Sequence, residues 1–124
     1  MTHPNTVHVL NGQNADSGDL DSLLRGWGFH VRAFSHVADL LGTTFQYAEQ
    51  GHRIAHTLLD LRGRSESPAE LLALYRASSV TRKQRIILIS DDPVQASQAE
   101  EHGMPFDSVL GSPLDKTLLF NALD

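Results

Sequence analysis

The first residue whose chemistry stands out is Asp60, a carboxylate within the apolar segment Leu58–Leu61. A carboxylate among leucines is costly to bury unless it is paired, hydrogen-bonded or reactive. Two later apolar segments also end in small polar residues: Ser90 follows one, and Ser112 with Pro113 follows the other. The residue types alone leave two alternatives for Asp60: it accepts hydrogen bonds from amides of the following loop, or it takes part in a reaction.

The elements that would position these residues alternate along the chain as a strand and then a helix, five times. β-branched and apolar runs bounded by turn-forming residues predict strands at Thr6–Leu10, Phe29–Phe34, Ile54–Leu61, Ile86–Ile89 and Asp107–Leu110. Apolar residues at helical spacing predict helices that begin near Asp16, Ser35, Pro68, Val94 and Leu114. The second helix either continues through Tyr47 or breaks at Gly42, and the residues leave both alternatives open.

Strand–helix units of this length form a parallel sheet with helices on both faces, because right-handed crossovers place them there. The nearly continuous apolar strands Ile54–Leu61 and Ile86–Ile89 should lie at its centre, and the alternating strand Phe29–Phe34 near an edge. In such doubly wound α/β folds, chemistry collects at the carboxyl ends of the strands. We therefore expect one domain over residues 1–124, with its core over about 6–123 and Asp60 at the functional end of the sheet.

Composition narrows the classes of function. The chain of 124 residues is 40% hydrophobic and 20% charged, values typical of a folded globular domain. Its net charge of −5 argues against a nucleic-acid binder, and the absence of cysteine excludes thiolate metal sites and cysteine nucleophiles. No apolar run is long enough to span a bilayer, and the polar first residues lack the layout of a signal peptide. We expect a cytoplasmic domain that does not contact the membrane.

Other residues that could carry chemistry favour structural roles. The seven histidines are scattered, with no pair at a metal-ligand spacing, so surface or strand-packing roles are expected. Asp91 and Asp92 precede Pro93, a pattern that favours capping of a helix. Arg62 and Arg64 stand on a loop, where an arginine is expected to be solvated. The sequence has no glycine-rich phosphate loop and no Gly-x-Ser-x-Gly nucleophile motif.

The order of the elements and two spacings resemble the receiver domain of two-component response regulators (CheY-like), over essentially the whole chain. Asp60, after two leucines, resembles the phosphoacceptor at the end of that family's third strand, and Ser90 holds the place of a hydroxyl that contacts the phosphoryl group. Pro113 matches the family's proline after a cis peptide bond. Leu23–Val31 looks like the family's first helix running into its second strand. The resemblance implies a flavodoxin-like, five-stranded parallel sheet in the order 2-1-3-4-5.

The departures from the family fall on the residues that carry its chemistry. Asn11 and Gly12 stand where the family has the acidic pair that holds Mg²⁺, a hard cation that prefers carboxylate oxygens. Ser112 replaces the lysine that pairs with phosphoryl charge, and Val109 replaces the aromatic switch residue. Phosphoryl transfer depends on positioning and on neutralising oxygen charge, so these losses weaken Asp60 as an acceptor. Asp60 is then the one side chain left as a weak metal ligand.

The leading interpretation is a degenerate receiver, or pseudo-receiver, of a two-component phosphorelay that acts through protein contacts and needs no cofactor. Eroded receivers of this kind often lie within hybrid histidine kinases, so the expected partner is a histidine kinase or another signalling domain. The face made by the fourth helix, fifth strand and fifth helix, Val94–Leu123, would carry these contacts or a homodimer. An apolar patch around Val109, Leu110 and Leu114 would support this surface.

Two alternatives to this interpretation belong to other classes. A working phosphoacceptor would take phosphate from a kinase histidine onto Asp60 with Mg²⁺, and would be at most an enzyme acting on itself. Arg62 or Arg64 would then supply the positive charge that the missing lysine does not. The third interpretation is a sensor of a small ligand such as a nucleotide, bound between the vacated acidic pocket and the arginine-rich loops.

Overall fold

Five parallel strands form a single sheet at the centre of the protein. The computed structural model describes residues 6–13, 19–51, 56–77, 85–91, 106–111 and 114–123. The strands are β1 (Thr6–Leu10), β2 (His30–Phe34), β3 (His56–Asp60), β4 (Ile86–Ile89) and β5 (Ser108–Leu110). Their order is β2-β1-β3-β4-β5, which confirms the predicted doubly wound sheet, with the two most apolar strands inside and β2 at an edge.

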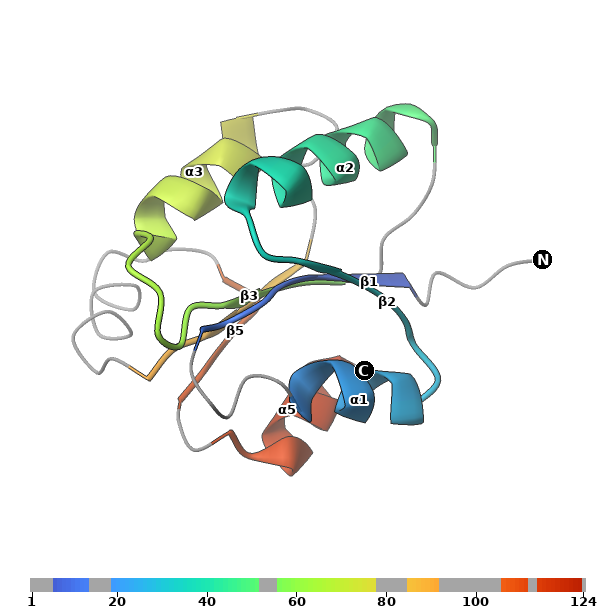
Figure 1. The fold of residues 1–124 in the computed structure, drawn as a ribbon, viewed down its shortest axis with the longest axis vertical. Helices are drawn as coiled ribbons and strands as arrows, with labels where there is room; N and C mark the ends of the chain where they lie inside the picture. Colours follow the sequence, from blue (N-terminus) through green and yellow to red (C-terminus); the bar gives the residue numbers. More distant parts are fainter. Residues whose placement is uncertain are drawn as a thin grey trace.

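Helices cover both faces of the sheet. They are α1 (Asp19–Gly26), α2 (Val37–Glu49), α3 (Pro68–Ala77) and α5 (Lys116–Ala122). Figure 1 shows α2 and α3 above the sheet and α1 and α5 below it. Helix α2 continues through Gly42 to Glu49, which settles the alternative that the sequence left open. The predicted helix Val94–His102 lies outside the described residues.

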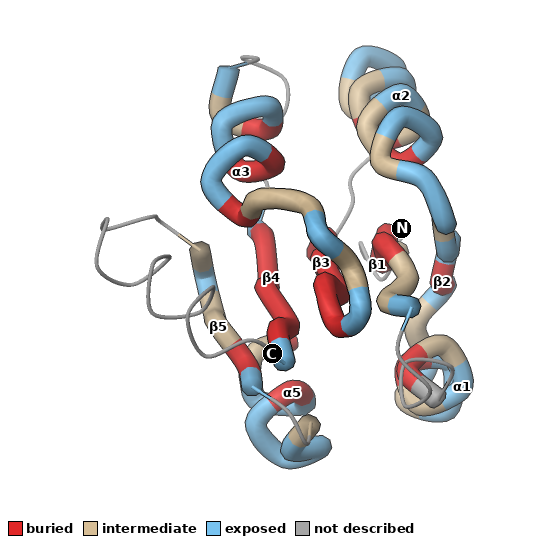
Figure 2. The backbone as a smooth tube through the Cα atoms, turned by 60° about the vertical axis from the view of Figure 1, so that its left-hand side comes forward, coloured by how far each residue is buried: buried red, intermediate tan, exposed pale blue. Residues whose placement is uncertain are grey.

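The core consists of two apolar layers, one on each face of the sheet, because successive side chains of a strand point to opposite faces. One layer packs strand residues such as Val9, Leu58 and Ile87 against α1 and α5. The other packs residues such as Leu59 and Leu88 against α2 and α3. All residues of β3 and β4 are buried, as Figure 2 shows for the middle of the sheet. Asp60, the last residue of β3, therefore lies in the buried middle of the sheet.

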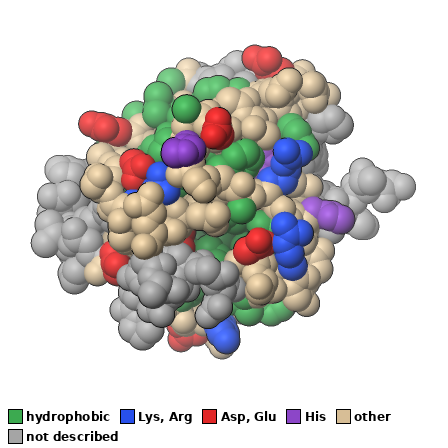
Figure 3. Space-filling model, viewed as in Figure 1, with side chains coloured by type: hydrophobic (Ala, Val, Ile, Leu, Met, Phe, Trp, Pro, Cys, Tyr) green, Lys and Arg blue, Asp and Glu red, His purple; other side chains and the backbone are tan. Residues whose placement is uncertain are grey.

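Of the three residues expected to form an apolar patch (Val109, Leu110 and Leu114), one is buried and two are partly buried. Leu110 is 8% exposed, Leu114 packs against the core layer that contains α1 and α5, and Val109 packs against the layer that contains α2 and α3. Within the described segments, three large apolar side chains are exposed: Leu74 (46%), Leu118 (54%) and Phe120 (52%). The surface in Figure 3 carries apolar side chains at several places between scattered acidic and basic groups.

None of the described helices has the length and apolar character needed to cross a membrane.

Candidate functional site at the carboxyl end of the sheet

Asp60 is the last residue of β3, and its side chain is fully enclosed, with 0% of its surface exposed. It pairs in register with Ile89, the last residue of β4, while Leu59 beside it pairs with Leu10 at the end of β1. The carboxylate thus lies at the centre of the carboxyl edge of the sheet, where the sequence placed it. At this depth the carboxylate requires compensating donors.

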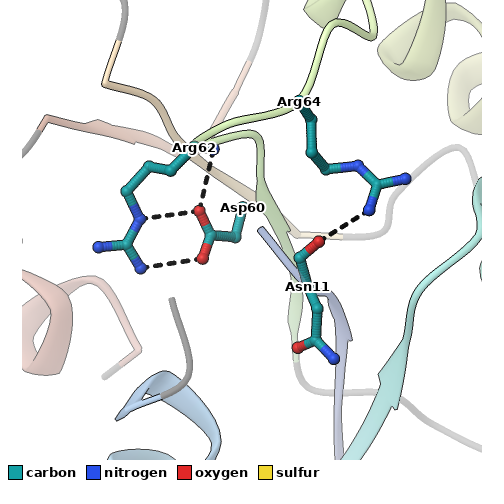
Figure 4. Close-up of polar contacts among 4 residues, drawn as sticks. All are labelled: Asn11, Asp60, Arg62 and Arg64. Carbon is teal, nitrogen blue, oxygen red and sulfur yellow. Dashed lines mark hydrogen bonds and ion pairs between the residues drawn. The ribbon is translucent and has the colours of Figure 1, made fainter. Parts of the chain in front are cut away.

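The donors come from a single residue, Arg62, two positions along the chain. The Nε of Arg62 donates to Oδ1 of Asp60 at 2.9 Å, and its Nη2 donates to Oδ2 at 2.9 Å. The backbone N–H of Arg62 makes a third bond to Oδ1 at 3.2 Å. Figure 4 shows the guanidinium lying edge-on against the carboxylate, so that two parallel bonds join them. This bidentate arrangement is the strongest form of a charged hydrogen bond between side chains.

A tight turn makes this close approach feasible. The backbone N–H of Arg64 donates to the carbonyl oxygen of Leu61 at 2.9 Å, and Gly63 has a φ of 74°, a conformation that glycine adopts without steric cost. The turn folds the chain back immediately after β3. Arg62 can therefore reach the carboxylate that precedes it by two residues and remain 2% exposed.

The second arginine of the loop is also ordered. Arg64 donates from Nε and Nη2 to the two carboxylate oxygens of Glu66, at 2.9 and 2.8 Å, and its side chain is 5% exposed. Hydrogen bonding to Arg64 lowers the pKa of Glu66 below its usual value. The Nη1 of Arg64 donates to the backbone oxygen of Asn11 at 2.9 Å and so ties this loop to the end of β1 (Figure 4).

The expectation that Arg62 and Arg64 are solvated is therefore wrong. Both guanidinium groups are enclosed because each has acceptor oxygens within reach: a buried carboxylate for Arg62, and Glu66 with Asn11 for Arg64. The sequence does contain a pattern that could have predicted the ion pair between Asp60 and Arg62: the arginine follows the aspartate by two residues, and Gly63 comes next and allows a tight turn. The expectation that Asp60 accepts a hydrogen bond from a loop amide is confirmed by the bond from the backbone of Arg62.

The other predicted site residues divide between those that the structure places and those outside it. Ser90 follows β4 with 3% of its surface exposed, and its backbone N–H donates to the carbonyl oxygen of Leu110 at 3.0 Å. Asn11 and Gly12 follow β1 and are partly buried. Parallel pairing brings Asn11, Asp60 and Ser90 to the same edge of the sheet. Ser112 and Pro113 lie outside the described residues.

The oxygen atoms near Asp60 do not fit a Mg²⁺ site. Magnesium requires near-octahedral oxygen coordination, supplied in part by carboxylates. Both carboxylate oxygens of Asp60 accept from the Arg62 guanidinium, the backbone oxygen of Asn11 accepts from Arg64, and the backbone oxygen of Arg62 accepts from the N–H of Gln13 at 2.7 Å. Across the described ranges, no three His, Asp or Glu side chains gather as metal ligands would.

Two histidines lie inside the sheet, in the strand-packing role expected from the sequence. His8 is fully buried; its Nδ1 lies 2.9 Å from the hydroxyl of Thr44, and its ring packs edge-on against Phe34 and Tyr47. Burial, with a smaller contribution from the charge of Arg32, lowers the pKa of His8 to about 4. Burial likewise lowers the pKa of His56. Both rings are therefore neutral near pH 7 and add no positive charge to the site.

Comparison with known proteins identifies the fold. No protein-family model matches the chain, and no curated protein matches it either. The structure is similar to a response regulator receiver protein from Pseudomonas putida, with a TM-score of 0.74 and 22% sequence identity over 99% of this chain and 98% of that one.

Two further solved structures show the same similarity. The receiver domain of a sensor histidine kinase from Pseudomonas aeruginosa PAO1, which has a magnesium ion in its active-site cleft, has a TM-score of 0.75 and 16% identity over 98% of this chain and 95% of that one. The chemotaxis response regulator CheY4 of Vibrio cholerae has a TM-score of 0.74 and 14% identity over 98% and 97% of the two chains. The chain therefore has the fold of response-regulator receiver domains.

Proposed function

We propose that this chain is a degenerate receiver domain of a two-component signalling system, in which a permanent ion pair between Asp60 and Arg62 takes the place of the phosphorylation cycle. The buried, bidentate contact between these two side chains carries the proposal. The domain is not an enzyme in this account, and it acts in the cytoplasm through protein contacts.

The chemistry of phosphorylation explains why this contact matters. A phosphoacceptor carboxylate must present one oxygen to the incoming phosphorus, and positive charges must neutralise the oxygens of the transferred group. Each oxygen of Asp60 instead accepts a hydrogen bond from the guanidinium, so an attack would require that contact to break first. The guanidinium, which is 2% exposed, would then lose its contact with the Asp60 carboxylate.

Most of the residues that assist phosphorylation in receiver domains are replaced in this chain. Ser90 stands in the position of the phosphoryl-contacting hydroxyl, but Asn11 and Gly12 provide no carboxylate for Mg²⁺, and Ser112 provides no ammonium group beside Pro113. A functional phosphoacceptor would need the arginines to leave Asp60 and Asn11 and then to stabilise the phosphoryl oxygens. The positions of Asp60 and Ser90 are the observation that favours this second function.

Incubation with acetyl phosphate and Mg²⁺, followed by intact-protein mass spectrometry, tests the proposal. We expect no gain in mass by the wild-type chain, while an intact receiver treated in parallel gains one phosphoryl group. A gain that is absent from Asp60→Asn would overturn the proposal and establish the phosphoacceptor function.

The proposed partner is a histidine kinase or another signalling domain, and the proposed contact surface is the C-terminal part of the chain that includes α5. Leu118 on α5 is 54% exposed, the largest exposed fraction among the large apolar side chains of the described residues. Leu118→Asp should therefore weaken a homodimer or a complex with the kinase. Leu74→Asp is the matched control, since Leu74 is 46% exposed on α3, away from this surface. Equal effects of both substitutions in sedimentation or binding measurements would contradict the proposed surface.

A further inference from the structure

We propose that Arg62 is an internal counter-ion that closes this edge of the sheet to divalent cations, and that removing its guanidinium exposes a cation site. This inference rests on the proposed function above and concerns how that function is maintained. It assigns to one side chain of this chain the positive charge that a bound metal ion would otherwise bring to Asp60.

The carboxylate of Asp60 needs a compensating positive charge. The carboxylate is fully buried, and an uncompensated charge at such depth is strongly unfavourable. A metal ion and a guanidinium are two ways to compensate it. In this chain the guanidinium of Arg62 covers both carboxylate oxygens, and its backbone N–H adds a third donor to Oδ1.

Two backbone oxygens lie at the same edge of the sheet as the carboxylate. The backbone oxygens of Asn11 and Arg62 belong to the loops after β1 and β3, and both are of the type that hard cations bind. Arg64 donates to the first at 2.9 Å, and the N–H of Gln13 donates to the second at 2.7 Å. Each carbonyl oxygen has a second lone pair, so the guanidinium of Arg62 is the group that must leave before a cation can use these oxygens together with Asp60.

The charge of Arg62 also repels a cation that approaches Asp60. A guanidinium remains charged at every accessible pH, so a divalent cation that approaches Asp60 meets a fixed positive charge already in contact with the carboxylate. The cation would have to displace Arg62, which is 2% exposed and would lose its bonds to Asp60. Removing the charge of Arg62 should strengthen the binding of a divalent cation at Asp60 by at least about tenfold. The repulsion between a single and a double positive charge a few ångströms apart is at least that large, even in water.

The experiment compares binding of Mn²⁺ and Mg²⁺ to the wild-type chain and to Arg62→Met and Arg62→Gln. Binding is measured by calorimetry, and thermal unfolding is followed over a millimolar range of each metal. We expect the melting temperature of the variants to rise with metal concentration and that of the wild type to stay constant, since a ligand that prefers the native state stabilises it. Arg62→Gln removes the charge but keeps a polar side chain about as long as that of methionine. It replaces Arg62→Met in the experiment if the methionine variant does not fold.

Two controls locate the effect. Asp60→Asn combined with Arg62→Gln should abolish the new binding, because the carboxylate supplies its negative charge. Arg25→Met removes the same charge from a side chain that is 57% exposed and pairs with Asp21 on the surface of α1, and it should leave metal binding unchanged.

The inference is overturned by metal binding of the wild type that matches that of the Arg62 variants, or by no binding to a folded Arg62 variant. Broadening of wild-type amide signals at residues 11–13 and 60–64 by Mn²⁺ would also overturn it, and this measurement needs no substitution. The inference and the proposed function fail separately. A wild type that is phosphorylated at Asp60 refutes the proposed function, whereas an unphosphorylated wild type that binds metal at Asp60 refutes the inference.

Discussion

Replacing Asp60 with asparagine should destabilise this protein far more than the loss of one hydrogen bond would. The substitution preserves the shape of the side chain but removes the negative charge that pairs with the buried guanidinium of Arg62. Removing one partner of a buried ion pair costs about 3–5 kcal/mol. A domain of this kind has a free energy of unfolding of about 5–15 kcal/mol, so Asp60→Asn should lose a large share of the total. The melting temperature should fall by about 10–20 °C.

Urea unfolding followed by circular dichroism measures this loss. Asp21→Asn is the matched control: Asp21 pairs with Arg25 at 2.6 Å, but the two side chains are 40% and 57% exposed. An exposed pair contributes about 1 kcal/mol or less, so the control should remain close to the wild type. The double variant Asp60→Asn with Arg62→Met should recover part of the loss, because it buries no unpaired charge. An Asp60→Asn protein as stable as Asp21→Asn would refute the reasoning.

The remaining predictions concern pH and individual contacts. The pKa of His8 is about 4 in the folded protein and 6.5 in the unfolded chain, so the unfolded state binds more protons between these values. The free energy of unfolding should therefore be highest above pH 6.5 and fall by about 3 kcal/mol towards pH 4. Urea unfolding at several pH values measures this loss, which should be smaller in His8→Asn. Asp115→Ala should cost about 1 kcal/mol in the same assay, because Asp115 caps α5 by accepting from the N–H groups of Thr117 and Leu118; a cost near zero would contradict that role. Arg64→Ala should cost about 1–3 kcal/mol, since it leaves the backbone oxygen of Asn11 without this donor, and an unchanged urea midpoint would show that the contact is unimportant.

The fold could be predicted from the sequence because its signals are local and agree with one another. The continuous apolar runs that became β3 and β4 require burial on both faces, and parallel strands joined by helices are the arrangement that provides it. The alternation in β2 matched an edge strand. The strand boundaries differed by a residue or two, as at Phe29, which precedes β2. Helix propensity around Gly42 could not show that α2 continues, since packing of Leu40 and Thr44 against the sheet decides it.

The order of the strands was enough to predict that Asp60 and Ser90 lie at the same edge of the sheet. It was not enough to predict the contacts that Asp60 makes there. The ion pair with Arg62 depends on a turn that reverses the chain after Leu61, and on the depth at which the carboxylate lies. An arginine on a loop is solvated in most settings, so its burial follows from the geometry of its partner rather than from its own neighbours in sequence.

The central claim is that Arg62 holds Asp60 in a lasting ion pair, and the Nε–H signal of Arg62 in a ¹⁵N–¹H NMR spectrum tests it most directly. The signal can be assigned by its loss in Arg62→Met. The ion pair predicts a slowly exchanging proton whose position does not change when Mg²⁺ and beryllofluoride, a phosphoryl mimic, are added together. A shift of this signal, or its disappearance on that addition, would mean that Asp60 exchanges its arginine for other partners and would contradict the account.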